Sequence, residues 1–216
     1  AGFAAATWMR GVPLIQCPTT LLAMVDSAIG GKTGVNIPQG KNLVGAFHHP
    51  IAVVADAECL QTLPAEEFRQ GLAEAVKYAV GEDQGLLEEL EKSRGSILAR
   101  HPAALTHLVE RCVRLKLAVV AEDGDETRGI RDRLNLGHTV GHAMEAASDF
   151  RWKHGDAVAA GLAVALTLGG RLGSCSSAFV ARGRELLEAL GLPWRPQLPW
   201  GAPVPGQQNQ KKFRCG

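Results

Sequence analysis

Residues 64–80 read PAEEFRQGLAEAVKYAV, and this stretch decides how the rest of the chain is divided. A proline is well tolerated in the first turn of a helix, where its missing N–H has no intrahelical partner. The apolar residues that follow recur every three or four positions, at Phe68, Leu72, Val76 and Ala79. This spacing predicts a helix over residues 64–80 that turns one apolar face toward a core.

Helical spacing continues on the C-terminal side of this segment, and no strand signal interrupts it. The expected helices cover residues 85–99, 103–122, 135–147, 155–172 and 176–190. On the N-terminal side, residues 12–17 and 51–55 are short apolar runs typical of buried strands. Between these runs, residues 19–29 have helical spacing and end at Gly30-Gly31, after which we expect a loop.

An order of strand, helix, loop and strand is typical of the late part of a βαβ sheet. We therefore expect residues 1–63 to be the remnant of an α/β domain and residues 64–192 to form an all-α domain. Residues 193–216 contain five prolines and a Gln/Lys/Arg run without apolar periodicity, which predicts an irregular tail, either disordered or read in a shifted frame. Because the chain has no initiator Met and begins inside a helical pattern, we expect a fragment.

The bulk composition argues against several classes of partner. The 23 basic residues are balanced by 22 acidic ones, so charge gives no reason to expect a nucleic acid or a membrane surface. No apolar run reaches the roughly 18 residues of a membrane span, and no signal segment opens the chain. The five cysteines are scattered without a Cys-x-x-Cys pair, which indicates reduced thiols and a cytoplasmic protein.

Three of the seven histidines, His138, His142 and His154, lie within seventeen residues. The first two are four residues apart and share one face of a helix, a spacing typical of metal or acid/base sites. The alternative is a polar pair at a helix start, with Asn135 as the N-cap. Catalytic zinc usually takes three protein ligands, but the spacing does not say which histidines bind. Glu74 is the best carboxylate candidate because its neighbours are apolar.

Other polar residues lie beside glycines or within apolar stretches. Gly31-Lys32-Thr33 resembles part of a nucleotide P-loop, but Asp26 stands where that motif needs glycine, so the P-loop interpretation fails. A turn that presents Asp26 and Lys32 to a polar ligand remains possible beside an ordinary turn. Several cations near a metal would suit an anionic, phosphorylated substrate, and the candidates are Lys32, Lys41, Lys77, Lys116 and Arg131. Arg131 lies one helical turn before Asn135, which would let it face the histidines. The alternative for Glu74 and Lys77 is a surface ion pair.

Taken in order, these motifs resemble the 3-dehydroquinate synthase family. The resemblance runs from residue 1 to about Pro193 and rests on residues 18–27, 30–36, 40–47, 71–78, 129–131, 134–145 and 154–158. It implies a Rossmann-like NAD-binding domain, of which the glycine-rich pyrophosphate loop and the first strands precede Ala1. It also implies that the domain after residue 63 binds a metal and the substrate.

The resemblance implies a role for each matching residue. The metal, usually zinc with cobalt as an alternative, falls on Glu74, His138 and His154, and His142 becomes a catalytic or substrate-contacting residue. The substrate pocket falls on Asp26, Lys32, Asn42, Lys77, Lys116, Arg131 and Asn135. Arg10 matches an arginine that reaches the neighbouring subunit, which implies a homodimer. NAD contacts fall on Thr19, Thr20, Lys32, Lys41, Cys59, Leu60, Gln61 and Thr62.

The family's reaction is a step of the shikimate pathway, which leads to chorismate and the aromatic amino acids. A carbon–oxygen lyase converts 3-deoxy-D-arabino-heptulosonate 7-phosphate to 3-dehydroquinate and phosphate through transient NAD oxidation, elimination, reduction and aldol closure. Another sugar-phosphate cyclase and a metal-dependent alcohol dehydrogenase are alternatives within the resemblance, and Arg131 with Leu134-Asn135 favours the dehydroquinate branch. A metal-binding or interaction module without catalysis is the alternative from another class.

Overall fold

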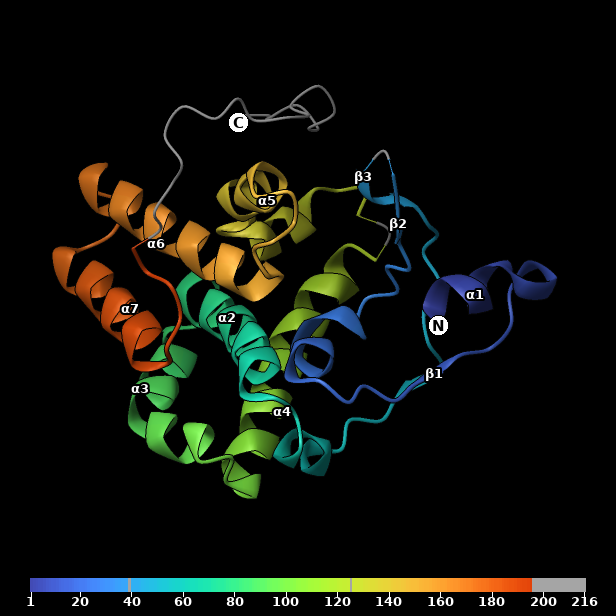
Figure 1. Ribbon diagram of the computed structural model, residues 1–216, viewed down its shortest axis with the longest axis horizontal. Helices are drawn as coiled ribbons and strands as arrows, with labels where there is room; N and C mark the ends of the chain where they lie inside the picture. Colours follow the sequence, from blue (N-terminus) through green and yellow to red (C-terminus); the bar gives the residue numbers. More distant parts are fainter. Residues whose placement is uncertain (39, 125, 196–216) are drawn as a thin grey trace.

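The computed structural model describes residues 1–195 apart from residues 39 and 125. An α/β part is followed by an all-helical part, as predicted (Figure 1). The helices of the second part are α2 (Ala65–Gly81), α3 (Gln84–Leu98), α4 (Pro102–Glu122), α5 (His138–Ala147), α6 (His154–Arg171) and α7 (Ser177–Ala189). The expected tail lies, from residue 196 on, outside the described residues, and the domain boundary at residues 63/64 stays a prediction.

Helix α2 forms the centre of the helical part and packs against α3, α4, α6 and α7 (Figure 1). The predicted apolar stripe is confirmed, because Phe68, Leu72, Val76 and Ala79 are all buried in the main hydrophobic core. The polar Glu74 and Lys77 of the same helix are buried as well. Burying two charged side chains on a central helix is unfavourable unless they are paired or bind a ligand. We therefore expect this face of α2 to contribute to a polar site.

Helices α5 and α6 pack at very close range. A Cβ atom on Gly161 would lie 2.0 Å from the carbonyl oxygen of Gly137, and one on Gly141 would lie 3.0 Å from the carbonyl oxygen of Ala157. Only glycine permits this approach of two backbones. The contact brings the first residues of the two helices, His138 and His154, to the same side of α2.

Residues 130–137 correct one expectation. The expected helix over residues 135–147 begins three residues later, at His138, and is preceded by the 3-10 helix η4 (Ile130–Asn135). Gly137 is the N-cap, with a φ of 78° in the left-handed region, which breaks the helical path between the two elements. Asn135 is therefore not the N-cap, and its amide instead lies 3.5 Å from Asp132 Oδ1.

The N-terminal part contains little regular structure. It opens with α1 (Gly2–Thr7) and the 3-10 helix η1 (Trp8–Arg10), and the 3-10 helix η3 (Ala57–Gln61) ends it. The two predicted strands are present but shorter, as β1 (Ile15–Gln16) and β4 (Ala52–Val53). They pair in parallel, with Ile15 opposite Ala52. The helix expected over residues 19–29 is mostly η2 (Ala23–Ser27), which is wound as a π-helix.

The loop expected after Gly31 contains an antiparallel hairpin of β2 (Val35–Ile37) and β3 (Gly40–Val44). The amide N–H of Asn42 donates to Asn36 Oδ1 at 3.0 Å, and Asn42 has a φ of 51° where the strand register shifts. A three-residue strand shows too little alternation to be recognised in the sequence. None of the helices in the described part of the chain combines the length and the apolar character that a membrane span requires.

Candidate active site and metal centre

Glu74, His138 and His154 converge on one point beside α2. Oε1 of Glu74 lies 3.5 Å from Nε2 of His138 and 3.3 Å from Nε2 of His154. The three groups each offer a ligand atom, and these atoms lie within 4.8 Å of one another. This Oε1 is fully buried and has no hydrogen-bond partner in the described part of the chain. One carboxylate and two imidazoles fit a catalytic zinc or cobalt site with an open position.

The electrostatics of the three groups reflect their crowding. Burial opposes the charge of Glu74, but Lys77, His154 and His138 together outweigh burial and lower the pKa of Glu74 to about 2. Burial lowers the pKa of His138, and the attraction of Glu74 only partly offsets it. Burial opposes protonation of His154 too, yet the carboxylates of Glu145 and Glu74 raise its pKa to about 9. A carboxylate held ionised in this way is a ready metal ligand.

His142 lies one helical turn after His138, and its side chain is exposed. Its ring centroid is 5.3 Å from that of His138 and 6.1 Å from that of His154. The three histidines that are close in the sequence are therefore also close in space. His142 also lies with Glu145 and His154 in a second group of possible ligand atoms.

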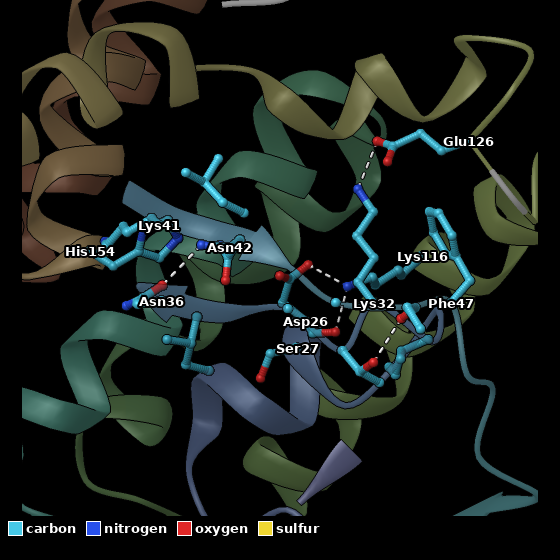
Figure 2. Close-up of a pocket in the computed structure, with 17 residues that line it drawn as sticks. Asp26, Ser27, Lys32, Asn36, Lys41, Asn42, Phe47, Lys116, Glu126 and His154 are labelled. Carbon is cyan, nitrogen blue, oxygen red and sulfur yellow. Dashed lines mark hydrogen bonds and ion pairs between the residues drawn. The ribbon is translucent and has the colours of Figure 1, made fainter. Parts of the chain in front are cut away.

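A cavity of about 760 Å³ opens beside the histidines, between η2, the β2–β3 hairpin and α4 (Figure 2). The lining includes six predicted site residues, namely Asp26, Lys32, Lys41, Asn42, Lys116 and His154. Figure 2 shows Lys41 and His154 at one end of the cavity and Lys32 and Glu126 at the other. Five side chains that the sequence assigned to the substrate or to NAD therefore line the same cavity as His154, one of the candidate metal ligands.

Asp26 connects the cavity to α2. Its Oδ1 accepts hydrogen bonds from Lys116 Nζ at 2.8 Å and from the Tyr78 hydroxyl at 2.7 Å, and it lies 3.9 Å from Lys77 Nζ. Burial opposes the charge of Asp26, but Lys116 and Lys77 outweigh it and hold its pKa well below the ordinary range. Lys77 also pairs with Glu74, so the predicted pair of Glu74 and Lys77 exists but is buried and links the metal centre to Asp26.

The two cavity lysines of the N-terminal part are paired with carboxylates of the helical part. Lys32 Nζ lies 2.7 Å from Oε1 of Glu126, and Lys41 Nζ lies 2.6 Å from Oε1 of Glu145. Both pairs cross between the two parts of the chain. An anion that binds in the cavity would meet these ammonium groups at opposite ends.

Arg131 corrects another expectation, because its side chain does not face the histidines. It is buried and donates to the carbonyl oxygens of Gly124 at 2.9 Å and of Gly30 at 3.3 Å. The 3-10 winding of η4 turns the guanidinium toward the Gly30-Gly31 turn, which precedes Lys32. Its place in the substrate pocket stays a prediction, as does that of the exposed Asn135.

The remaining predicted residues lie away from the cavity lining. Arg10 is exposed at the end of η1. Thr20 Oγ1 accepts from the amide of Ala23 at 3.2 Å at the start of η2, next to the exposed Thr19. The predicted NAD contacts at Cys59, Leu60, Gln61 and Thr62 lie in and after η3, where Leu60 is buried in the core and Gln61 and Thr62 are exposed. These assignments stay predictions.

Sequence reasoning missed the carboxylates and the phenol that hold the charged groups in place. Glu145, Glu126 and Tyr78 contact Lys41, Lys32 and Asp26, respectively. A signal for Glu145 was present, because it follows His142 by three residues on the same helical face. Glu126 lies in a loop and offered no periodic signal.

Comparison with known proteins agrees with this geometry. A family model described as 3-dehydroquinate synthase N-terminal matches residues 1–70, and one described as 3-dehydroquinate synthase C-terminal matches residues 71–213. The chain belongs to the 3-dehydroquinate synthase family. The 3-dehydroquinate synthase of Idiomarina loihiensis is 48% identical over 218 residues, which cover 100% of this chain and 61% of the relative. That of Symbiobacterium thermophilum is 53% identical over 194 residues, which cover 89% of this chain and 54% of the relative. The chain therefore spans little more than half the length of these relatives.

Solved structures of other cyclases share the fold. A 2-epi-5-epi-valiolone synthase from Streptomyces hygroscopicus subsp. jinggangensis, with NAD+ and Zn2+ bound, superposes with a TM-score of 0.85 at 31% identity, over 91% of this chain and 55% of that one. A 2-deoxy-scyllo-inosose synthase in complex with carbaglucose-6-phosphate, NAD+ and Co2+ gives a TM-score of 0.77 at 31% identity, over 92% of this chain and 53% of that one.

Proposed function

We propose that the protein acts as a 3-dehydroquinate synthase, a phosphate-releasing lyase that converts 3-deoxy-D-arabino-heptulosonate 7-phosphate to 3-dehydroquinate. The observation that carries the proposal is the donor set of Glu74, His138 and His154, one member of which also lines a cavity rich in ammonium groups. The relatives that are 48% and 53% identical carry this name, whereas the two cyclases of different name are 31% identical.

Glu74, His138 and His154 would hold a zinc or cobalt ion, and NAD would lie against Thr19, Thr20, Lys32, Lys41 and residues 59–62. Bound there, the metal and NAD supply the acidification of a substrate hydroxyl and the reversible removal of a hydride. The buried Oε1 of Glu74 supports the metal assignment, because an ion would give it the partner it lacks within the described chain.

The chain's own residues bind and orient an anionic sugar acid. Lys32, Lys41 and Lys116 offer ammonium groups to the phosphate and carboxylate. Asp26 is kept ionised by Lys116 and Lys77, so it can accept hydrogen bonds from substrate hydroxyls on its part-exposed side. His142, next to the metal ligands, is the imidazole best placed to carry a proton. The exposed Arg10 would act across a homodimer interface, in a cytoplasmic enzyme.

Phosphate release by the purified chain, with added NAD and zinc, tests this function. We expect release from 3-deoxy-D-arabino-heptulosonate 7-phosphate and none from glucose 6-phosphate, with activity removed by Glu74→Gln. Glu188→Gln provides a control. It makes the same change of a carboxylate to an amide at an exposed residue of α7, which contributes no residue to the proposed site.

Two other outcomes would identify the alternatives. Release from glucose 6-phosphate alone would assign the chain to another sugar-phosphate cyclase, since the 2-deoxy-scyllo-inosose synthase that shares the fold is bound to carbaglucose-6-phosphate. Stoichiometric zinc binding that Glu74→Gln abolishes, without phosphate release from any sugar phosphate, would leave a metal-binding chain without catalysis.

A further inference from the structure

Glu145 touches both the metal centre and the cavity wall. Its side chain is only 2% exposed, and its Oε1 lies 2.6 Å from Nζ of Lys41 and 3.4 Å from Nδ1 of His154. Its Oε2 is buried without a hydrogen-bond partner within the described residues. A buried carboxylate is unfavourable unless it is paired, so these two neighbours define what Glu145 does.

The two histidines of the centre are oriented in the same way. Each points Nε2 at Oε1 of Glu74, and each has an oxygen acceptor near its other ring nitrogen. For His138 that acceptor is the carbonyl oxygen of Leu136, 3.4 Å from Nδ1. For His154 it is the side chain of Glu145. An acceptor at the second nitrogen of a metal-binding imidazole fixes its tautomer and ring orientation and raises its basicity.

We propose that Glu145 is a positioning residue of the metal centre. It accepts the Nδ1 proton of His154, which leaves the lone pair of Nε2 directed toward the ion held by Glu74 and His138. Through Lys41 on β3, the same carboxylate joins the metal centre to the hairpin that lines the cavity. This inference rests on the metal binding proposed above.

A role for Glu145 as a metal ligand, together with His142 and His154, is the competing assignment, since these groups also offer ligand atoms within 4.8 Å of one another. Two contacts argue against it. Lys41 places a positive charge 2.6 Å from Oε1 of Glu145, which would repel a second cation there. The Nε2 atom of His154 faces Glu74 at 3.3 Å, which commits that histidine to the first group of ligands.

The first test is the zinc affinity of the 216-residue chain, measured by competition with a chromophoric chelator. We expect Glu145→Gln to raise the dissociation constant about 10-fold or more, because the amide keeps the shape but not the charge that orients His154. Asp149→Asn is the matched control: it removes the same charge from an exposed residue just after α5 and leaves the affinity nearly unchanged.

The other results would overturn the proposal in distinguishable ways. An unchanged affinity in Glu145→Gln would remove the positioning role and leave the metal site intact. Equal weakening by Asp149→Asn would reduce the effect to long-range charge. Complete loss of zinc, as expected for Glu74→Gln, would make Glu145 a ligand. A wild-type chain that binds no zinc would overturn the metal site and the positioning role together.

A second measurement does not depend on the folding of any variant. Long-range 1H–15N NMR spectra of the zinc-loaded wild-type chain report which nitrogen of His154 carries the proton. The proposal expects a protonated Nδ1 and a zinc-bound Nε2, with the Nδ1 proton shifted by the carboxylate. A zinc-bound Nδ1 would contradict it.

Discussion

The helical part, from α2 onward, and the N-terminal part before residue 64 differ in how they bury apolar side chains. Most of the main core belongs to the helical part, and the members before residue 64 are Leu21, Met24, Val25 and Leu60. Around β1 and β4, by contrast, large apolar side chains are between 38% and 74% exposed, namely Trp8, Met9, Ile15, Ile51, Val53 and Val54. A parallel pair of two-residue strands contributes little stability by itself.

This difference divides the candidate site in two. The proposed metal ligands come from α2, α5 and α6, and α6 packs against both α2 and α5. The cations Lys32 and Lys41 come from the N-terminal part and reach the helical part through ion pairs. The proposed metal centre therefore depends on the helical core, whereas the cavity depends on both parts.

Hydrogen exchange should show the largest contrast between the two parts. We expect amides in the middle of α2 and α6 to exchange only on global unfolding, and those of β1 and β4 by local opening. The difference in protection should be roughly 3 kcal/mol or more in opening free energy. Protection of β1 equal to that of α2 would show that the two parts unfold as one unit.

Gly161→Ala should be the most damaging single substitution in the helical part. The added methyl group would lie 2.0 Å from the carbonyl of Gly137 and would separate α5 from α6. We expect a loss of about 3 kcal/mol of unfolding free energy in urea titrations. Gly95→Ala is the control, because a Cβ there meets nothing within 4 Å, and it should stabilise α3 by about 0.5–1 kcal/mol. Similar effects of the two substitutions would argue against the close crossing.

The buried ion pair of Lys116 with Asp26 should contribute more to stability than the exposed ion pair of Lys32 with Glu126. Lys116→Met removes a side chain that is 7% exposed and leaves Asp26 with Tyr78 and Lys77, so we expect a loss of about 2–3 kcal/mol. Lys32→Met removes a lysine that is 49% exposed, and should cost less than about 1 kcal/mol. Thermal unfolding of both variants measures the difference, and the reverse order would contradict the burial of the Asp26 pair.

The smallest effects should come from helix caps. Asp83 accepts from the amides of Gly85 at 2.8 Å and Leu86 at 3.3 Å at the start of α3, so Asp83→Ala should lower the unfolding free energy by about 1 kcal/mol. Asp56 caps the short η3 through Glu58 N at 2.9 Å. Asp56→Ala should cost about 0.5 kcal/mol or less, because the helix that it caps is short. A larger effect at Asp56 would place more of the stability in the N-terminal part.

The helical part was more predictable than the N-terminal part, for a physical reason. Phe68, Leu72, Val76 and Ala79 repeat with the period of a helix over about three turns, so α2 could be predicted directly from the sequence. The hairpin 35–44 has too few residues to show a period of two, and the position of Asn42 depends on its contact with Asn36. The start of α5 depends on the left-handed Gly137, which lies against Gly161 of α6, a contact between distant residues that no local pattern encodes.

The sequence predicted which residues belong to the candidate site better than it predicted the contacts between them. The spacing of His138 and His142 and the apolar setting of Glu74 pointed to a metal site. Glu74 and His138 do come together, with His154 as the third group, whereas His142 lies in a second group with Glu145 and His154. The predicted direction of the Arg131 side chain was wrong. Its guanidinium is held by the carbonyl oxygens of Gly30 and Gly124, and helical periodicity in the sequence does not predict either contact. The long-range partner of Lys41 was invisible for the same reason.

X-ray diffraction at the zinc edge, from crystals of the chain grown with zinc, tests the central claim most directly. The helical part alone should supply the ligands, so the anomalous difference map should show one strong peak bounded by Glu74 Oε1, His138 Nε2 and His154 Nε2. A peak between His142 and Glu145, or none near Glu74, would contradict the account.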